Sequence, residues 1–376
     1  MYDLKKIRKQ IDEIDDEILR LFEERMHLSR KVAEFKINTG KQVFDKEREL
    51  SKLKVLGEKA NSTFTKHGIQ ELFQQIMAMS RKLQYQLLEE HAVEENSAFT
   101  QVKQLPKDHV TVVFQGVEGA YSFTAMKTFF GNDIDSFHVK TWKDAMEAVQ
   151  SKKADYAVLP IENSTAGIVH DIYDLLVEYD HFIVGEQIVP CEHLLLGLKE
   201  ASLKDIKTVY SHPQALMQCR DFLSGYEEWQ QVRVENTAGA AKKIAEDQDK
   251  TQAAIASAYA GDFFGLQVLK EKIYTNTNNS TRFIVVSKEK TYSSDAKKIS
   301  VCYELPHESG SLYNSLSHFI YNGLNMTKIE SRPIPKRNWE YRFFVDFEGN
   351  LSDSAVKNAL RGLSAEVQQL RVLGNY

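Results

Sequence analysis

Two basic residues stand on an apolar stripe in the first forty positions. Apolar residues alternate three and four apart from Leu4 to Phe35, and Arg25 interrupts this heptad pattern where an apolar residue is expected. A guanidinium at that point must find an anion or reach water. Lys36 follows eleven residues later, about 20° away around a helix and roughly 16 Å along it. The two cations can therefore face one pocket.

Further polar residues accompany this pair. Arg8 flanks the same stripe nearer the N-terminus, on a stretch that a partner's helix could bring alongside. Asp45, Arg48 and Glu49 lie on one face of a second helical stretch, and Ser80 and Gln84 lie one turn apart on a third. No nucleophile and base are paired in this segment, so its chemistry would depend on holding a substrate and stabilising developing charge. A pericyclic rearrangement of a dicarboxylate fits that requirement. Alternatively, Arg25 makes a structural ion pair and the other side chains are solvated.

Polar segments also follow the apolar runs in the middle of the chain. They are Gly116 to Ser122, Pro160 to Gly167, Ser211 to Gln214 and Glu235 to Gly239. Ligands of open α/β sheets bind beyond the carboxyl ends of strands, beside helix N-termini, so these segments could line a cleft. Each can also be interpreted as a helix cap or a turn, with Ser211 to Gln214 matching a capping box.

Capping does not explain Arg282, which follows Thr281 in the chain. The two residues directly precede the apolar run Phe283 to Val286. A hydroxyl beside a guanidinium at the entrance of a strand could serve one anionic ligand.

The C-terminal region contains two short motifs. Gly310 precedes Ser311 and Leu312 at the expected start of a helix, and Glu330 to Pro333 ends an expected strand. Alone, these motifs indicate a turn and a strand terminator.

The elements that must position these residues begin with a helical segment. With Asp3 as N-cap and no Pro or Gly before Gly40, one helix of about 35 residues is predicted, followed by helices near 45–56 and 65–90. Such a long helix extends beyond a small domain. We therefore expect an intertwined homodimer or a higher homo-oligomer.

The rest of the chain changes character twice. After an expected linker at 93–108, short apolar strands alternate with helical patterns over 109–288, which indicates a parallel α/β sheet in two lobes around a cleft. Residues 298–376 follow the order strand, helix, strand, strand, helix, strand. The predicted fold is multidomain, with an all-α helical dimerising N-terminal domain at 1–92, a two-lobed α/β domain and a ferredoxin-like βαββαβ domain.

Composition narrows the possible functions. The formal net charge is −5, which argues against nucleic acid or an anionic membrane surface as a partner. Cys191, Cys219 and Cys302 form no Cys-x-x-Cys pair, and His193 and His212 have no further ligand at metal-site spacing. We expect no disulfide framework, metal or cofactor. No apolar run approaches the roughly 18 residues that cross a bilayer, so we interpret the chain as cytoplasmic.

Residues 1 to 90 resemble the helical, AroQ-type chorismate mutase. The resemblance is carried by Arg8, Arg25, Lys36, Asp45, Arg48, Glu49, Ser80 and Gln84. It implies that Arg25, Lys36 and Arg48 hold the carboxylates and ether oxygen of chorismate, and that a partner supplies Arg8. It also implies that Lys36 and Gln84 are catalytic, stabilising negative charge on the ether oxygen, while Glu49 holds the ring hydroxyl. Asp45 and Ser80 would complete the substrate site.

Residues 110 to 287 resemble prephenate dehydratase, whose fold is similar to the periplasmic binding proteins. The matching motifs are Gly116 to Ser122, Pro160 to Gly167, Tyr210 to Gln214 and Thr281 to Phe283. Ala120 and Phe123 depart from the family's usual Ser and His. The resemblance implies that prephenate loses carbon dioxide and its ring hydroxyl, so that the ring becomes aromatic.

The same resemblance implies roles for individual residues. Thr281 would protonate or polarise the departing hydroxyl, with a relay through Glu162 or water, and Arg282 would hold a carboxylate. The other residues expected to line the cleft are Asn163, Ser164, Ser211 and Gln214.

The C-terminal segment resembles an ACT domain of the phenylalanine-sensing kind, with Ser311 in place of the usual Ala. The resemblance implies an amino-acid pocket at a domain dimer interface. Its residues would be Gly310, Leu312, Asn325, Glu330, Ser331, Arg332 and Pro333.

Together these resemblances imply a bifunctional enzyme of phenylalanine biosynthesis. It would convert chorismate to prephenate as a mutase and prephenate to phenylpyruvate as a dehydratase, with phenylalanine as the feedback effector. Two other interpretations stay open, a catalytically inactive amino-acid-sensing regulator and a chain that retains one of the two activities. Intact Thr281, Arg282 and mutase cations argue against a pure sensor.

Overall fold

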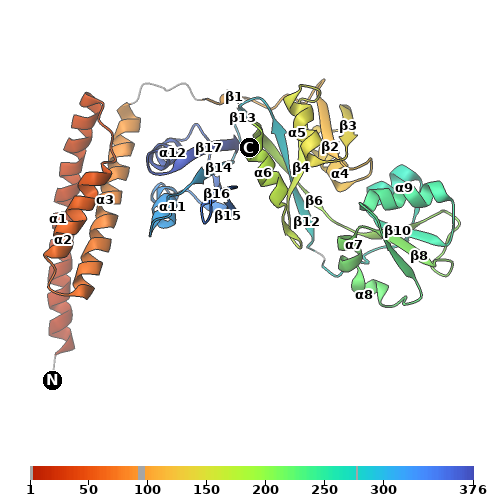
Figure 1. Ribbon diagram of the computed structural model, residues 1–376, viewed down its shortest axis with the longest axis horizontal. Coiled ribbons are helices and arrows are strands. Elements are labelled where there is room, and N and C mark those ends of the chain that lie inside the picture. The colour runs from red at the N-terminus through yellow and green to blue at the C-terminus, as the bar shows by residue number, and fades with distance from the viewer. Residues whose placement is uncertain (1–2, 92–97, 277) are drawn as a thin grey trace. The chain divides into compact units, whose positions relative to one another are not determined.

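A computed structural model describes residues 3–91, 98–276 and 278–376 (Figure 1). The chain divides into two compact units, Met1–Ala98 with Lys297–Val372, and Phe99–Ala296 with Leu373–Tyr376. The first unit contains the N-terminal helices and most of the C-terminal βαββαβ segment. The second contains the two α/β lobes.

The N-terminal region consists of α1 (Leu4–Thr39), α2 (Lys46–Glu58) and α3 (Thr63–His91). The Asp3 carboxylate caps α1 by accepting a hydrogen bond from the Lys5 amide at 3.0 Å, as predicted. Gly40 ends the helix with φ at +66°, a left-handed conformation that glycine adopts without a Cβ clash. Asp45 caps α2 in the same way as Asp3. The long first helix is confirmed.

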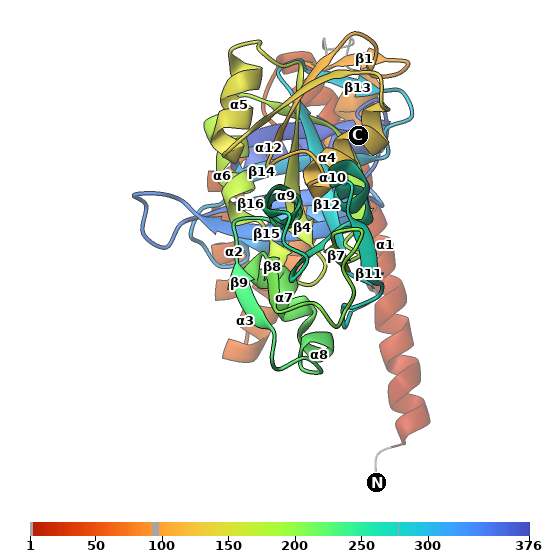
Figure 2. The same ribbon diagram turned by 90° about the vertical axis from the view of Figure 1, so that its right-hand side faces the viewer.

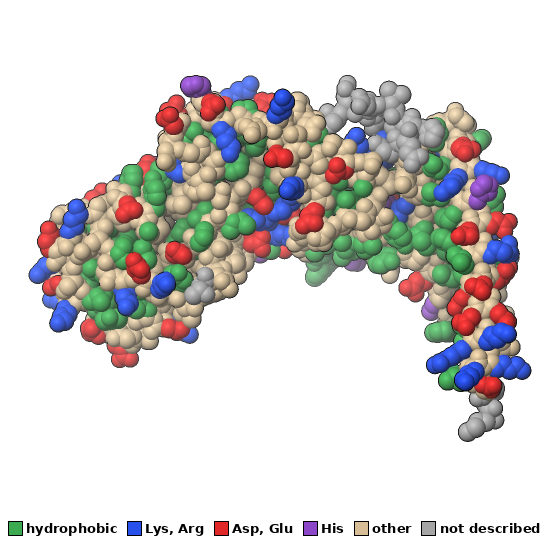
Figure 3. All heavy atoms as spheres, turned by 180° about the vertical axis from the view of Figure 1, so that it is seen from behind, with side chains coloured by type: hydrophobic (Ala, Val, Ile, Leu, Met, Phe, Trp, Pro, Cys, Tyr) green, Lys and Arg blue, Asp and Glu red, His purple; other side chains and the backbone are tan. Residues whose placement is uncertain are grey.

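The heptad stripe of α1 is exposed in the single chain. Exposed members are Leu4, Ile7, Ile11, Ile14, Ile18, Leu21, Leu28, Val32 and Phe35. The N-terminal turns of α1 extend beyond α2 and α3 (Figure 2), and charged side chains crowd that projecting end (Figure 3). One side of α1 thus presents an apolar stripe that the other two helices do not cover.

The first lobe of the second unit is built on a sheet with the order β6-β12-β4-β2-β3, to which β5 adds on β4. Its strands are β2 (Thr111–Gln115), β3 (Asp135–Val139), β4 (Tyr156–Asn163), β5 (Gly167–Ile168), β6 (Phe182–Pro190) and β12 (Ser280–Ser287). Its helices are α4 (Tyr121–Phe130), α5 (Trp142–Gln150) and α6 (His170–Glu178). Phe114, Met126 and Val158 lie in its core.

The second lobe has a sheet with the order β11-β7-β10-β8-β9. Its strands are β7 (Leu194–Gly197), β8 (Thr208–Ser211), β9 (Gln230–Arg233), β10 (Gln252–Ala256) and β11 (Gln267–Lys270). Its helices are α7 (Pro213–Gln218), α8 (Arg220–Leu223), α9 (Thr237–Asp247) and α10 (Ala258–Phe264). The chain passes between the lobes twice, after β6 and before β12.

The two sheets are mixed, which corrects the expectation of a parallel sheet. β12 runs antiparallel to both β4 and β6, and β7 runs antiparallel to β10. The prediction fails because β12 returns from the second lobe to the first, and an apolar run does not reveal the direction in which its strand enters a sheet. Within the expected linker, β1 (Thr100–Val102) pairs with β13 (Thr291–Ser293). The other part of that linker, 93–97, lies outside the described residues.

The C-terminal segment has the predicted order of elements. They are β14 (Lys298–Glu304), α11 (Ser311–Tyr321), β15 (Met326–Pro333), β16 (Tyr341–Glu348), α12 (Ser354–Glu366) and β17 (Gln368–Asn375). The strands lie in the order β15-β16-β14-β17, as in ferredoxin-like folds. Tyr303, Phe319 and Phe347 form the centre of its core.

Candidate functional site

Arg25 and Lys36 both lie partly buried on α1 and face the other two helices. The Arg25 guanidinium donates to the Ile76 carbonyl of α3 at 3.4 Å, and Lys36 Nζ donates to the Val43 carbonyl at 2.7 Å. Burial lowers the pKa of Arg25, and the nearby Glu49 carboxylate opposes this shift. The helices therefore bring an α1 cation and an α2 carboxylate together.

Lys36 lies in the field of the α2 residues. Burial lowers the pKa of Lys36, with Asp45 and Glu49 acting to raise it and Arg48 acting to lower it. The structure thus gathers five of the predicted mutase residues. Arg48 itself is exposed, and so is Arg8 on the projecting part of α1.

Ser80 and Gln84 form the α3 side of the same region, and both are buried. The Ser80 hydroxyl donates to the Ser29 hydroxyl of α1 at 2.7 Å, and Gln84 Nε2 donates to Ser80 Oγ at 3.2 Å. Within the described part of the chain, Gln84 Oε1 is buried without a hydrogen-bond partner. A buried unpaired amide oxygen is costly in free energy, and a bound ligand could satisfy it.

A cation that sequence reasoning missed lies between these two residues. Arg81 is buried, and its Nη1 forms an ion pair with Glu49. No heptad break or motif marks Arg81 in the sequence. It lies between Ser80 and Lys82, in a short polar run of α3 that looks like an exposed surface.

Strand register decides which dehydratase candidates share a face. In the antiparallel pair of β12 and β4, Thr281 lies opposite Asn163 and Arg282 lies opposite Glu162. Successive side chains of a strand point to opposite faces of a sheet. Thr281 and Asn163 therefore share one face, and Arg282 and Glu162 share the other.

A cavity of about 430 Å³ opens on the Thr281 face, between the two lobes. Of the predicted residues it is lined by Asn163, Gln214 and Thr281, together with Ala120. Further lining residues include Tyr121, Ser122, Trp142, Cys191, His193, His212, Gln218, Asn236, Thr237 and Asn279. The first residues of α4, α5 and α9 are among them. Amide donors at helix N-termini favour an anionic ligand there.

Thr281 has two polar neighbours in this cavity. Its Oγ1 accepts a hydrogen bond from Asn163 Nδ2 at 2.9 Å and lies 3.1 Å from Cys191 Sγ. Burial raises the pKa of the Cys191 thiol, so the sulfur carries its proton at neutral pH. A protonated thiol and an amide can both donate to the threonine oxygen.

A chain of side chains extends from Asn163 across the cavity. Asn163 Nδ2 also donates to Asn279 Oδ1 at 2.9 Å, and Asn279 Nδ2 donates to Gln218 Oε1 at 3.1 Å. His193 Nε2 lies 2.8 Å from the same Gln218 oxygen, and its Nδ1 lies 3.1 Å from the Tyr121 hydroxyl. Burial lowers the pKa of His193, which favours the neutral ring. His193 is thus part of a hydrogen-bonded network that includes both lobes.

Arg282 and Glu162 are not where the sequence interpretation put them. Neither lines the cavity, and the Arg282 guanidinium lies 3.2 Å from a Glu162 oxygen and 3.3 Å from a Glu186 oxygen. The cleft role expected for Glu162, and its relay to Thr281, are at odds with this geometry because adjacent strand residues alternate faces. The carboxylate-holding role expected for Arg282 has the same difficulty.

Two serines expected at the cleft have other contacts. Ser211 is fully buried and donates to the Ile255 carbonyl at 2.7 Å, whereas Ser164 donates to the Asn278 carbonyl at 3.0 Å. The expected capping box at Ser211 is wrong, because the N-cap of α7 is His212, whose ring nitrogen accepts from the Gln214 amide. Phe123 packs in the core of the first lobe, away from ligand contact.

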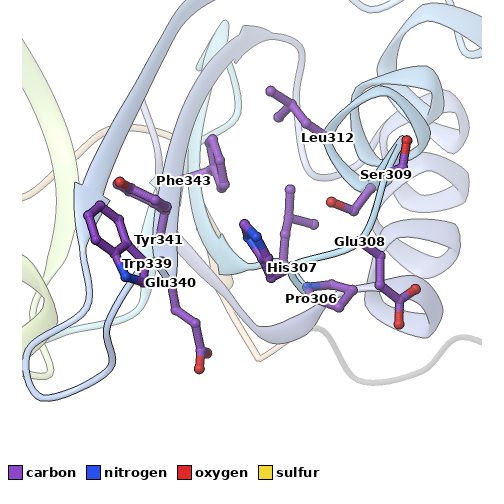
Figure 4. A pocket seen from close by; sticks show the side chains of 11 residues that line it. Pro306, His307, Glu308, Ser309, Leu312, Trp339, Glu340, Tyr341 and Phe343 are labelled. Carbon is purple, nitrogen blue, oxygen red and sulfur yellow. The ribbon is translucent and has the colours of Figure 1, made fainter.

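The C-terminal candidates are divided between two places in the fold. Leu312 lines a cavity of about 340 Å³ with Pro306, His307, Trp339 and Phe343 (Figure 4). Gly310, with φ at +81°, is the N-cap of α11 beside it. The remaining candidates do not line this cavity: Asn325 precedes β15, and Glu330, Ser331, Arg332 and Pro333 lie on β15, an edge strand of the sheet.

Over the described residues, no group of three or more His, Cys, Asp and Glu side chains is arranged to hold a metal ion. In the same residues, no helix has the combined length and apolarity needed to span a bilayer.

Comparison with known proteins places these sites in a family. The chain matches the family model of chorismate mutase type II over residues 7–85 and that of prephenate dehydratase over residues 112–291. The bifunctional chorismate mutase/prephenate dehydratase of Aquifex aeolicus is 33% identical and aligns over 100% of this chain and 98% of its own length. That of Escherichia coli K12 is 32% identical over 98% of this chain and 95% of its own. The chain belongs to the family of bifunctional chorismate mutase/prephenate dehydratases.

Three solved structures each match 71% of this chain. A prephenate dehydratase from Arthrobacter aurescens in complex with L-phenylalanine has a TM-score of 0.66 and 32% identity, over 71% of this chain and 89% of its own. A quorum-quenching acylase has the same TM-score and identity, over 71% of this chain and 97% of its own. The prephenate dehydratase of Staphylococcus aureus has a TM-score of 0.62 and 25% identity, over 71% of this chain and 99% of its own.

Proposed function

We propose that this chain converts chorismate to prephenate in its helical part and prephenate to phenylpyruvate, carbon dioxide and water in its two-lobed part, under feedback by phenylalanine. One observation carries the proposal: a single chain combines a cluster of partly buried cations and a carboxylate among α1, α2 and α3 with a polar cavity around Thr281. We place the mutase in residues 1–92, the dehydratase in 109–288 and the effector domain in 298–376.

The mutase step needs positioning and charge stabilisation, with no covalent help from the protein. Arg25, Lys36 and Arg48 bind the two carboxylates and the ether oxygen, and Glu49 orients the ring hydroxyl. As the carbon–oxygen bond breaks, negative charge grows on the ether oxygen, where Lys36 and the Gln84 amide donate hydrogen bonds. For Gln84 to do so, its Nε2 must turn from Ser80 toward the substrate. Asp45 and Ser80 act mainly by holding α2 and α3 in place.

Arg8 reaches a mutase pocket from the α1 of a second chain. The exposed apolar stripe of α1 supports this arrangement, because a partner helix would remove its large side chains from water. The protein is therefore a homodimer at least, and its two mutase pockets are shared between chains.

The dehydratase step depends on the direction of the Thr281 hydroxyl. A hydroxyl has one proton to donate and two lone pairs to accept with. Asn163 Nδ2 donates to one lone pair, and we assign the Cys191 thiol as the donor to the other, in a pair where either atom can donate. The Thr281 proton is then free to point to the ring hydroxyl of prephenate and to polarise its departure. As carbon dioxide leaves, the electrons of the broken carbon–carbon bond enter the ring and expel hydroxide, which takes a proton from solvent to become water.

The substrate carboxylates are held by neutral groups in this cavity. Its lining contains helix N-termini and amides, with Gln214 and Asn236 among the latter. Arg282 acts from the opposite face of β12, where its pairing with Glu162 and Glu186 fixes the strand that carries Thr281. Glu162 supports the cavity through its ion pair with Arg282, and Ser164 and Ser211 support it through their hydrogen bonds to backbone carbonyls.

We assign the C-terminal segment to an ACT domain that binds phenylalanine. Its ferredoxin-like order and the cavity beside Leu312 support the assignment, as does the solved relative in complex with L-phenylalanine. Gly310 opens the helix that carries Leu312. The residues on and beside β15 would join the pocket through a second domain paired at that edge, since they lie outside the single-chain cavity. The three cysteines are free and buried, which suits a cytoplasmic enzyme.

The test is to add purified protein to chorismate without metal or nucleotide and to follow chorismate, prephenate and phenylpyruvate. Phenylpyruvate shows that both sites work, and prephenate that accumulates shows the mutase alone. Unchanged chorismate would support a sensor without catalysis, provided that titration calorimetry shows phenylalanine binding. A Leu312→Ala variant should weaken that binding by about tenfold while dehydration without phenylalanine stays unchanged.

A further inference from the structure

Arg81 connects the mutase helices to the C-terminal segment within the first compact unit. The side chain is 7% exposed. Nη1 contacts Glu49 on α2, and Nε donates to Glu366 Oε1 at 2.7 Å. Its guanidinium carbon lies 4.8 Å from the centre of the Phe44 ring. A planar guanidinium can hold two carboxylates in a fixed geometry, which a lysine could not do.

The Glu366 end of this arrangement is anchored in the ferredoxin-like fold. Glu366 is the last residue of α12, and its Oε2 lies 3.3 Å from Nε2 of His318 on α11. Burial acts to raise the pKa of Glu366, but His318 and Arg81 outweigh it and the pKa is lowered. Glu366 is therefore an ionised carboxylate between two nitrogen groups.

The Glu49 end lies in the proposed mutase pocket. Arg81 is adjacent in sequence to Ser80 and three residues before Gln84 on α3. Removal of Arg81 would leave two carboxylates partly or largely buried without their shared cation, a situation that costs much more free energy than loss of an exposed ion pair. The position of the Glu49 carboxylate thus depends on a residue that does not itself need to touch chorismate.

The same residues line a cavity next to the proposed effector pocket. Glu49, Arg81 and Glu366 line a cavity of about 300 Å³. It shares Leu305, Pro306, Glu308, Ser309 and Ser311 with the cavity beside Leu312 in Figure 4. Residues 305–311 are thus a common wall, and a ligand that displaces this wall on one side changes the surroundings of the ion pairs on the other.

We propose that Arg81 is a positioning residue of the mutase, holding Glu49 in place through an ion-pair chain that Glu366 anchors in the C-terminal ferredoxin-like segment. The proposal rests on the mutase function proposed above and deepens it. It makes mutase activity depend on a carboxylate 285 residues further along the chain, outside the helical domain.

The test compares Arg81→Met, Arg81→Lys and Glu366→Gln in the full-length chain. The matched control is Tyr313→Phe, which removes a hydrogen bond of 3.2 Å between α11 and Gln75 of α3 without touching Glu49 or Arg81. Mutase kcat and KM are measured with chorismate, and dehydratase kcat and KM with prephenate.

Arg81→Met should lower the mutase kcat/KM by about tenfold or more, mainly through KM, because a misplaced Glu49 no longer orients the substrate. Arg81→Lys should recover part of that loss, and Glu366→Gln should cost about threefold. The double variant Arg81→Met/Glu366→Gln should be no worse than Arg81→Met alone, since both act through one chain of contacts. Dehydratase constants should stay at their wild-type values in all variants.

Unchanged mutase constants in Arg81→Met, additive losses in the double variant, or an equal loss of dehydratase activity would each overturn the proposal. A wild-type chain that does not consume chorismate would instead refute the proposed mutase function. Hydrogen exchange in α2 separates the two failures: faster exchange in Arg81→Met and Glu366→Gln, but not in Tyr313→Phe, supports the ion-pair anchor independently of turnover.

Discussion

The mutase pocket and the dehydratase cavity face the same problem, a small dicarboxylate, with different groups. Arg25 and Lys36 are set among α-helices, close to Glu49, and burial lowers the pKa of each. The dehydratase cavity has no Lys or Arg among its lining residues in the described chain, and it presents helix N-termini and amides instead, together with one carboxylate, Glu235. Arg282, the guanidinium that the sequence predicted for this cleft, lies on the other face of its strand.

The difference follows from where charge moves in the two reactions. In the rearrangement, negative charge accumulates on an ether oxygen, and a fixed cation stabilises the transition state more than the substrate. In the elimination, a carboxylate loses its charge as carbon dioxide departs. A strong ion pair to that carboxylate would stabilise the substrate and slow the step. Neutral donors bind the anion without that disadvantage.

The largest effect should come from Thr281→Ala, which removes the hydroxyl that contacts Asn163 and Cys191. We expect dehydratase kcat to fall by about 1000-fold, because the departing hydroxyl loses its polarising donor. Mutase turnover in the same protein is the control and should not change. Thr281→Ser should retain much of the activity, and dehydration that survives in Thr281→Ala would remove Thr281 from the mechanism.

Arg25→Met should have the next largest effect, on the other site. Mutase kcat/KM should fall by about 100-fold, since a partly buried cation that holds the substrate is lost. The control is Arg20→Met on the same helix, whose guanidinium forms exposed ion pairs with Glu17 and Glu24. If Arg20→Met and Arg25→Met lose mutase activity equally, Arg25 has no special role in holding the substrate, and the contrast between a cationic and an amide-lined site fails.

A smaller effect is expected at Cys191, which tests how the groups beside Thr281 direct its hydroxyl. Cys191→Ala should lower dehydratase kcat by about tenfold with little change in KM, because one lone pair of Thr281 is left open and its proton can turn away. Cys191→Ser keeps a donor and should stay within about threefold of wild type. Equal activity in the Ala and Ser variants would contradict this role.

The smallest effect concerns His193 and pH. Because the folded-state pKa of His193 lies below its ordinary value near 6.5, lower pH protonates the unfolded chain before the folded one. The contribution of His193 to stability is therefore constant well above pH 6.5, and stability falls as pH drops below about 6.5. Between pH 7.5 and 5.5, Tm of His193→Gln should drop by about 2 °C less than wild type. The exposed His67→Gln serves as control, and identical Tm profiles would show that His193 does not contribute.

Much of the fold could be predicted from periodicity. The Asp3 cap, the 36-residue α1 and the βαββαβ order all depend on local patterns that neighbouring segments reinforce. Strand direction could not be predicted in this way, because β12 has the same apolar pattern whichever way it runs in the sheet. The polar residues at strand ends were recognisable as a group, but their roles were not: Asn163 and Gln214 line the cavity, whereas Ser211 bonds to the backbone of β10.

The sequence by itself determined which residues are candidate mutase cations and the order of the helical, α/β and βαββαβ segments, because heptad breaks and apolar periodicity are local features of the chain. Only the tertiary structure decided that neighbours Thr281 and Arg282 face opposite sides of β12, and that Arg81 joins Glu49 to Glu366. The physical reason is that side-chain direction depends on strand register, and that a buried charge takes whichever partners the packing of distant segments brings within reach.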